Sequence, residues 1–214
     1  HHSCIYKKPS HLNFEHAAVI PLAGVTAFRA LFKKAKINKY DNILITGIGG
    51  GVASLALVFA LKTGANVFVT SGTDSKIQKA ISLGAIAGIN YNNNQWDKKM
   101  IELSENKINV VIDGTGGGSF SKYLDILNYG GRIVSYGATL GCASEFNLHR
   151  IFWKQIKLFG TTMGSPKDFA EMIDFIDENK VEPVIDEVIS LENVSDAFRK
   201  LNAGNHFGKL VVRI

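Results

Sequence analysis

Four glycines with the spacing to cradle a phosphate stand between an apolar run and an apolar, almost uncharged segment. The run covers residues 43–46, and the segment covers residues 52–61. The glycines between them are Gly47, Gly49, Gly50 and Gly51. A continuous apolar run is typical of a strand buried on both faces, and glycine permits a sharp turn that a ligand can approach closely. Because the helix that follows begins with unpaired amides, this order of elements predicts an anion site.

The glycine spacing departs from the usual dinucleotide fingerprint. The pattern G-x-G-x-x-G counted from Gly47 needs a glycine where the chain has Val52. The pattern Gly47-x-x-Gly50-x-x-Ala53 fits instead, and alanine still allows a helix to pack closely on its strand. A glycine-rich turn without a ligand is the alternative, although four glycines beside a buried helix serve packing poorly.

The residues after the second apolar run, 66–71, would choose between the two dinucleotides. An acidic side chain at the end of this run binds the ribose 2′-hydroxyl and repels a 2′-phosphate. Here the position is Ser71, and Lys76 follows five residues later. A hydroxyl and an ammonium suit a phosphate dianion, so NADP(H) is favoured over NAD(H). In the alternative, Ser71 caps a turn and Lys76 lies on the surface. Asp74 is the nearby carboxylate, but from a helix it can point away.

The elements that must position these groups alternate as strand and helix, which predicts an α/β doubly wound parallel sheet of the Rossmann type. Strands are expected at 42–46, 66–71, within 86–91, and at 109–113, 132–136 and 157–161. Helices are expected at 51–63, 73–83, 96–105, 120–127 and 149–155. Functional groups should lie at the carboxyl ends of the strands, because the helix that follows each strand begins there.

The two ends of the chain do not continue this alternation. A helical segment at 14–35 is interrupted at Pro21. After residue 164 the pattern predicts a helix at 166–179, a strand at 184–191, a helix at 193–202 and a strand at 210–214. Within the helix at 193–202, Ala197 and Phe198 are expected to face inward.

Composition narrows the classes of protein that fit. The 214 residues are 46% hydrophobic with a net charge of +5, which suits a globular protein with one large core. The scattered basic residues form no stripe with aromatic residues, so we expect no nucleic-acid partner. No apolar run reaches the length of a membrane span, and no hydrophobic signal sequence is visible. Residues 1–3 resemble the end of an affinity tag.

The cysteines and the termini also bear on where the protein works. Cys4 and Cys142 lie far apart and form no metal-type cluster, which argues against a disulfide scaffold and against structural zinc. A reducing compartment fits this usage, so we expect a cytoplasmic protein, with an organelle not excluded.

Taken together, the motifs resemble the medium-chain dehydrogenase/reductase superfamily, specifically its zinc-independent quinone oxidoreductase-like branch. They occur in the family order from about residue 9 to the end of the chain. The motifs are AAVIPLAGVTA at 17–27, GIGGGVAS at 47–54, LGA at 83–85, IDGTG at 112–116, GGRIV at 130–134 and FGKL at 207–210.

This resemblance implies which residues contact an NADP(H) cofactor. The nicotinamide would be lined by Thr26, Tyr136, Gly137 and Ala138. The pyrophosphate would be met by Gly50, Gly51, Val52 and Lys209. The phosphorylated ribose would be held by Ser71, Lys76 and Tyr91. The passage from adenosine to nicotinamide would be flanked by Asp113 and Thr115.

The chain departs from the family in two ways. Zinc enzymes of the superfamily carry a cysteine ligand where this chain has Leu22, which cannot bind zinc, so we expect no metal. The family also has a substrate domain of more than a hundred residues before the first of these motifs. Residues 21–164 are therefore expected to form the dinucleotide-binding domain, and residues 1–20 and 165–214 to be remnants of a GroES-like substrate domain.

The predicted function is an NADPH-dependent oxidoreductase that transfers hydride to a small molecule, either a quinone, an enone or a carbonyl. A dinucleotide-binding module without turnover is the alternative, and a purely structural domain is a third. No proton donor can be named. Tyr136 is the best-placed hydroxyl, but we expect it to pack on the nicotinamide. His16, His149 and His206 are expected to be surface or satisfied core groups.

The resemblance also implies a homodimer. The sixth strands, around 157–161, would pair edge to edge and continue the sheet. An uncovered edge strand of this composition would otherwise invite aggregation.

Overall fold

The six-stranded parallel sheet at the centre of the molecule confirms the predicted Rossmann-type fold. The computed structural model describes residues 5–143 and 145–214, so the predictions for Cys4 and for residues 1–3 lie outside the described residues. The strands follow the order β3-β2-β1-β4-β5-β6. Their bounds are β1 (Asn42–Ile45), β2 (Asn66–Ser71), β3 (Ala87–Asn90), β4 (Val110–Asp113), β5 (Arg132–Ser135) and β6 (Lys157–Gly160). The strand order reverses between β1 and β4, which is where such sheets bind ligands.

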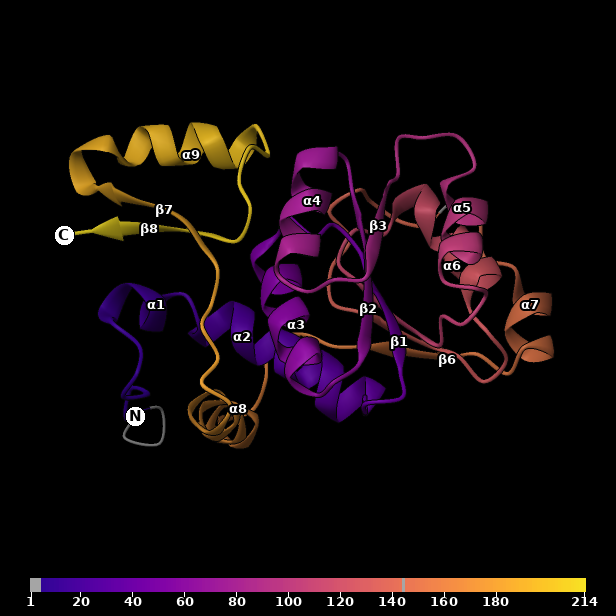
Figure 1. Cartoon of the computed structure of the whole chain (residues 1–214), viewed down its shortest axis with the longest axis horizontal. Helices are drawn as coiled ribbons and strands as arrows, with labels where there is room; N and C mark the ends of the chain where they lie inside the picture. The colour runs from indigo at the N-terminus through magenta and orange to yellow at the C-terminus, as the bar shows by residue number, and fades with distance from the viewer. Residues whose placement is uncertain (1–4, 144) are drawn as a thin grey trace.

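Helices cover both faces of this sheet (Figure 1). One face carries α2 (Pro21–Phe28), α3 (Gly51–Lys62) and α4 (Asp74–Ser82); the other carries α5 (Trp96–Leu103) and α6 (Phe120–Ile126). Ile43 and Ile45 point into the core under the first set of helices, while Leu44 points into the core under the second. Because both faces are covered, the strand needs no polar alternation.

The helical segment before β1 is divided where the sequence suggested. A short helix, α1 (Phe14–Ala18), ends before Pro21, which stands in the first turn of α2. A π-helix, η2 (Arg29–Ala35), continues α2. The guanidinium of Arg132 donates to the carbonyl of Ala35 at 2.7 Å, so a side chain of β5 satisfies the end of this helix.

The sixth strand is followed by α8 (Pro166–Glu178), which packs on the Rossmann core. It begins with a capping box in which Ser165 and Asp168 satisfy each other's backbone amides. Met172 and Ile176 are fully buried and belong to the same core as α2 and α3. A short helix, α7 (Leu148–Trp153), precedes β6, and two 3-10 turns are η3 (Gly117–Ser119) and η4 (Leu191–Asn193).

The C-terminal residues form a separate two-stranded parallel sheet with one helix. It comprises β7 (Ile185–Ser190), α9 (Val194–Asn202) and β8 (Lys209–Arg213). The helix α1 lies beside β8 in Figure 1, and Arg213 donates to Glu15 at 2.7 Å. We call this arrangement the C-terminal unit, meaning residues 185–213.

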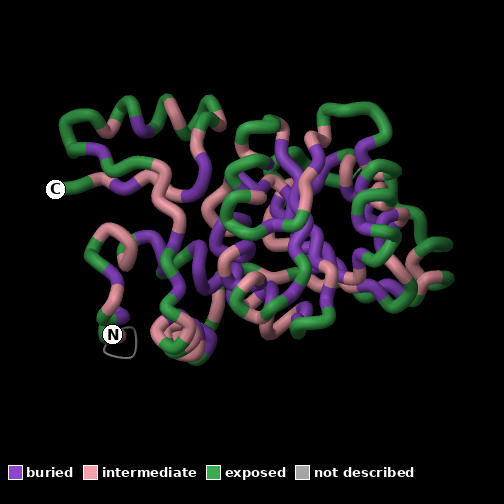
Figure 2. Tube along the Cα trace, viewed as in Figure 1, coloured by how far each residue is buried: buried purple, intermediate pink, exposed green. Residues whose placement is uncertain are grey.

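The helix of the C-terminal unit corrects one prediction. Ala197 is buried as expected, but the side chain of Phe198 is 61% exposed. Figure 2 shows the same contrast, with much of α9 exposed and the central strands buried. Phe198 borders a cavity between α9 and β8 together with Ala197, and the two-stranded sheet is too narrow to enclose its ring. None of the described helices is long and apolar enough to cross a membrane.

Candidate functional site

A cavity of about 790 Å³ opens at the carboxyl ends of β1, β2 and β4, beside the point where the strand order reverses. Its walls come from the glycine turn after β1, from the segments that follow β2, β3, β4 and β5, and from the loop between α9 and β8. The predicted residues that line it are Gly50, Gly51, Val52, Ser71, Lys76, Tyr91, Thr115 and Tyr136. The structure thus brings most of the predicted site residues around one space.

The glycine turn after β1 leaves the first amides of α3 facing this cavity. Gly47 adopts a left-handed backbone with φ of +60°, and its carbonyl accepts a hydrogen bond from the amide of Gly50 at 3.0 Å. Gly50 is the N-cap, and no side chain caps the helix. The twelve-residue helix therefore presents the positive end of its dipole and its free amides to any anion in the cavity.

Two lysine side chains close over this turn because glycine leaves room for them. A Cβ placed on Gly49 would lie 2.8 Å from Nζ of Lys76, and one placed on Gly51 would lie 2.5 Å from Cδ of Lys209. Any larger residue at either position would displace a lysine. The turn and the two cations thus form one surface of complementary charge for a phosphate.

The turn after β2 presents a hydroxyl and an ammonium without a carboxylate. Ser71 is buried at the strand end, and its hydroxyl accepts a weak bond of 3.4 Å from the amide of Thr73. Lys76 donates to the carbonyl of Gly204, and burial lowers its pKa. Asp74 is turned away, because its carboxylate accepts from Asn90 at 3.0 Å.

Asp113 lies beneath the cavity instead of lining it. It is fully buried, and one carboxylate oxygen accepts from the hydroxyls of Thr46 and Thr115 at 2.7 Å each and from that of Tyr123 at 3.1 Å. The other oxygen accepts from the amide of Gly116 at 3.0 Å. Asp113 therefore fixes the turn after β4, which carries Thr115 into the cavity.

Tyr136 forms part of the wall just after the end of β5. Its ring occupies the space that a side chain on Gly114 would need. Burial, and then the charge of Asp113, raises the pKa of Tyr136 far above its ordinary value. The phenol therefore stays protonated at neutral pH and is a weak acid.

Five of the predicted residues lie outside the lining of the main cavity: Asp113, described above, and Thr26, Lys209, Gly137 and Ala138. Thr26 is buried and donates to the carbonyl of Leu22 at 2.8 Å. Lys209 lines a neighbouring cavity of about 210 Å³ together with Gly51. Gly137 and Ala138 do not line the main cavity, whereas the two residues that follow them, Thr139 and Leu140, do.

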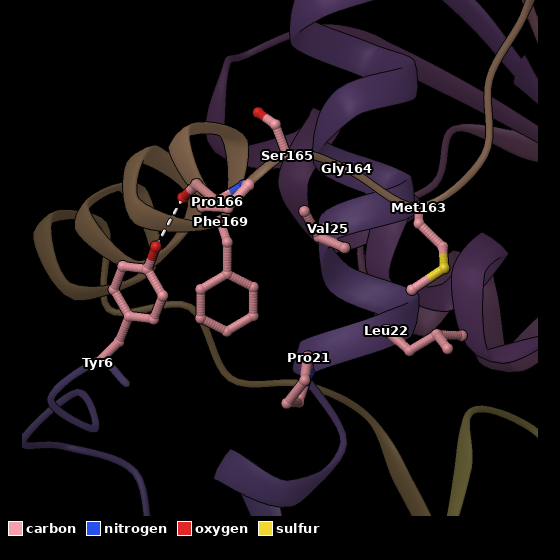
Figure 3. Close-up of a pocket in the computed structure, with 9 residues that line it drawn as sticks. All are labelled: Tyr6, Pro21, Leu22, Val25, Met163, Gly164, Ser165, Pro166 and Phe169. Atoms are coloured by element: carbon pink, nitrogen blue, oxygen red, sulfur yellow. Dashed lines mark hydrogen bonds between the residues drawn. The ribbon is translucent and has the colours of Figure 1, made fainter. Parts of the chain in front are cut away.

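A second cavity, of about 370 Å³, lies beside the first turns of α2 and is mostly apolar (Figure 3). Leu22 and Met163 flank it with side chains 61% and 52% exposed, and Tyr6 closes one end by donating to the carbonyl of Pro166 at 2.8 Å. Leu22 stands one helical turn before the buried Thr26. The lining residues are Tyr6, Pro21, Leu22, Val25, Met163, Gly164, Ser165, Pro166 and Phe169.

The loop between α9 and β8 is a wall that the sequence did not reveal. Residues 202–206 line the main cavity, and the amide of Gly208 donates to the carbonyl of Gly49 at 3.0 Å. Sequence spacing could not bring this loop to the glycine turn, since more than 150 residues separate them. The hydrogen bond between Gly208 and Gly49 is what joins them.

The three histidines named from the sequence behave differently from one another. Nδ1 of His16 lies 2.7 Å from the side-chain oxygen of Asn13, and His149 is exposed, as expected. His206 instead lines the main cavity, and its buried Nδ1 has no hydrogen-bond partner among the described residues.

Side chains suited to metal binding do not gather in the described ranges 5–143 and 145–214. No group of three or more His, Cys, Asp and Glu residues there could hold a metal ion. Cys142 is exposed.

Comparison with known proteins gives a consistent picture. A family model described as zinc-binding dehydrogenase matches residues 51–178. The chain is 38% identical over 224 residues to the zinc-type alcohol dehydrogenase-like protein YogA of Leptosphaeria maculans, covering 100% of this chain and 62% of that protein. The chain therefore spans about three fifths of the length of that relative.

Two solved structures share the fold. A crystal structure of an NAD-dependent alcohol dehydrogenase matches with a TM-score of 0.90 and 32% identity over 98% of this chain and 61% of that one. A 2-octenoyl-CoA carboxylase reductase in complex with NADP and 2-octenoyl-CoA also matches with a TM-score of 0.90, at 25% identity, over 98% of this chain and 52% of that one.

Proposed function

Since the chain belongs to the zinc-binding dehydrogenase family, within the medium-chain dehydrogenase/reductase superfamily, we propose that it is an NADPH-dependent oxidoreductase. Hydride would pass from the nicotinamide to a quinone, an enone or a carbonyl. The observation that carries this proposal is the cavity at the strand reversal, where uncapped amides of α3 and the side chain of Lys76 face one space. That combination suits a phosphorylated dinucleotide.

The preference for NADPH rests on the end of β2. Ser71 and Lys76 line the cavity there, while Asp74 is held away by Asn90. A carboxylate at this position would favour the free hydroxyl of NAD, and an ammonium favours the 2′-phosphate. The names of the two similar solved structures mention different dinucleotides, NAD in one and NADP in the other. The proposed preference for NADPH therefore rests on Ser71 and Lys76.

Bound NADPH would supply the hydride, and the chain would position it and exclude water. The amides of Gly51 and Val52, with Lys209, would hold the pyrophosphate. Tyr136 would pack on the nicotinamide without giving up its proton, because its pKa is raised. Asp113 would not contact the cofactor itself but would hold the turn that carries Thr115 in place.

The apolar cavity beside Leu22 suits the apolar part of a carbonyl substrate. Leu22 offers no ligand to a metal, so we propose reduction without a catalytic zinc ion. Thr26 is buried one helical turn after Leu22 and lines neither this cavity nor the main one. Turnover without zinc would then depend on alignment and on the exclusion of water.

The division into domains remains a proposal. Residues 21–164 would form the dinucleotide-binding domain, and residues 1–20 and 165–214 would belong to a substrate domain. The ion pair between Arg213 and Glu15 supports the assignment of the N-terminal and C-terminal segments to one domain. The packing of α8 on the Rossmann core is the observation that does not fit this division. Dinucleotide binding without turnover is the alternative for a chain of this extent, because Leu22 and Met163 stand exposed beside the apolar cavity.

A homodimer through β6 is also proposed. This strand is the edge of the sheet, and apolar side chains next to it are exposed: Leu158 by 46%, Phe152 by 60% and Trp153 by 67%. Pairing of two such edges would cover them. Light scattering should give twice the chain mass, and a Leu158→Lys variant should be monomeric; a monomeric parent protein would contradict the proposal.

Binding and turnover can be tested separately. Thermal unfolding with NADPH and with NADH should show a larger rise in midpoint with NADPH. Oxidation of NADPH by a quinone, followed by absorbance, tests turnover. Binding without oxidation would favour the binding module, and no shift with either dinucleotide would overturn the proposed cofactor site.

A further inference from the structure

His206 stands between the two lysines that flank the glycine turn. It lines the main cavity together with Lys76, and it lines the neighbouring cavity together with Gly51 and Lys209. His206 and Gly51 thus border both spaces. The backbone holds His206 there, because the amide of Gly208 donates to the carbonyl of Gly49 at 3.0 Å.

One ring nitrogen of His206 lacks a hydrogen-bond partner in the part of the chain that the structure describes. Nδ1 is buried, and none of the described residues hydrogen bonds to it. Buried polar atoms nearly always have a partner, so one without any is open to a ligand or to a change of protonation. A phosphate oxygen in the cavity would satisfy such a ring.

The charges around His206 are arranged against its protonated form. Burial, and then the ammonium of Lys76, lowers its pKa, and Lys200 and Lys209 act in the same direction. Asp186 is the one carboxylate that opposes them. Lys200 already pairs with Asp186 at 2.6 Å, and the amide of Phe207 donates to it at 3.1 Å.

We propose that His206 is a further phosphate-contacting residue of the dinucleotide site and that it gains a proton when the dinucleotide binds. This inference rests on the proposed function, since the anion is a phosphate group of the cofactor. In the free protein the ring is neutral at pH 7. A phosphate beside Lys76 and Lys209 reverses the sign of the local field, which favours the imidazolium.

The sign of the pH dependence follows from this linkage. The pKa of His206 is low in the free protein and higher in the complex, so binding takes up a proton between the two values. Affinity should rise as pH falls through that window and stay constant above it. From pH 8 to pH 6 the gain that depends on His206 should reach up to about tenfold, the effect of shifting one pKa by about one unit.

Calorimetry in buffers of different ionisation enthalpy measures the proton uptake directly. NADPH and NADH are titrated into the parent protein, His206→Gln, His206→Lys and His149→Gln at pH 7. The parent should take up more protons than His206→Gln, while His149→Gln, changed at an exposed site on α7, should match the parent. His206→Lys should show no proton uptake at this position, because a lysine is already charged before the dinucleotide binds. For the same reason its affinity for the dinucleotide should not fall between pH 6 and pH 8.

The two dinucleotides identify which phosphate is contacted. Uptake that depends on His206 with both indicates the pyrophosphate, and uptake with NADPH alone indicates the 2′-phosphate; either result supports the inference. Equal uptake in the parent and in His206→Gln would overturn it while leaving the cofactor site intact. Failure of both dinucleotides to bind the parent would overturn the proposed function as well.

Discussion

The central sheet and the C-terminal unit differ in how much of their side-chain surface is buried. In β1, Ile43 and Ile45 are fully buried between two layers of helices, and burial of that kind is the main source of stability. The C-terminal unit is half exposed, with Phe198 61% exposed. It reaches the sheet through the ring of Phe207, which is buried in the same core as Ile43 and Ile45, and through polar contacts of Gly208 with Gly49 and of Lys79 with Asp186.

This difference gives the cavity one wall on the buried sheet and one wall on a half-exposed unit. The glycine turn belongs to the sheet, whereas residues 202–206 belong to the C-terminal unit. A ligand that contacts both the glycine turn and residues 202–206 would add non-covalent contacts between the sheet and the C-terminal unit. We therefore expect changes in the sheet to lower global stability, and changes in the C-terminal unit to alter local opening and ligand binding.

Asp113→Ala should produce the largest effect. It leaves the buried donors of Thr46, Thr115, Gly116 and Tyr123 without their acceptor, at a cost of at least about 3 kcal/mol in the free energy of unfolding. Denaturant unfolding measures this. The control Tyr123→Phe removes a single donor and should cost about 1 kcal/mol. Equal losses in the two variants would show that the carboxylate does not organise the turn.

Gly208→Ala should loosen the C-terminal unit while the sheet stays intact. Gly208 has a φ of +96°, and a Cβ there would overlap the carbonyl of Val184, which costs about 1–3 kcal/mol. Hydrogen exchange should accelerate in β8 and not in β1. Gly160→Ala is the matched control, because the space around that glycine is open. Faster exchange throughout the protein would contradict the division into two regions.

Lys76→Glu should weaken NADPH binding by at least about tenfold, because it replaces a charge-assisted contact with repulsion. NADH, which lacks the 2′-phosphate, should lose much less. Fluorescence titration gives both dissociation constants. Lys98→Glu makes the same charge change at an exposed position on α5 and should affect neither. An equal loss for NADPH and NADH would refute the role of Lys76 in choosing the cofactor.

Acid should loosen the C-terminal unit before it unfolds the sheet. Burial opposes the ionisation of Asp186, but hydrogen bonds from Lys200 and from the amide of Phe207 outweigh it and hold the pKa of Asp186 below its ordinary value. The stabilisation is complete above the ordinary pKa of 3.8 and is lost as pH falls through the lower, folded value.

The size of this acid effect should be about 1 kcal/mol, the smallest of the four. Hydrogen exchange in β7 and β8 between pH 5 and pH 3 measures it, and Asp186→Asn should remove the pH dependence. A pH profile unchanged by that substitution would mean that other carboxylates control the attachment.

The sheet and its glycine turn could be predicted because they leave local signals. The apolar run 43–46, the glycines after it and the helix behind them are adjacent in the sequence, and short-range physics fixes their order. Ser71 and Lys76 could be placed for the same reason. The buried position of Asp113 and the absence of Thr26 from the cavity depend on how the elements pack. The spacing of residues along the sequence does not indicate this packing.

The wall formed by residues 202–206 could not be predicted from the sequence. His206 looks like any surface histidine until the contact between Gly208 and Gly49 brings its loop to the glycine turn. Phe198 was wrongly expected to face inward for a related reason: the helical pattern shows which side chains share a face with Ala197, but not how narrow the sheet beneath them is.

The central claim is that amides at the start of α3 receive the phosphates of a dinucleotide, and amide chemical shifts test it most directly. On titration with NADPH, the largest changes should fall on Gly49, Gly50, Gly51 and Val52, followed by residues 202–206. Shifts confined to other parts of the chain, with these amides unmoved, would contradict the account.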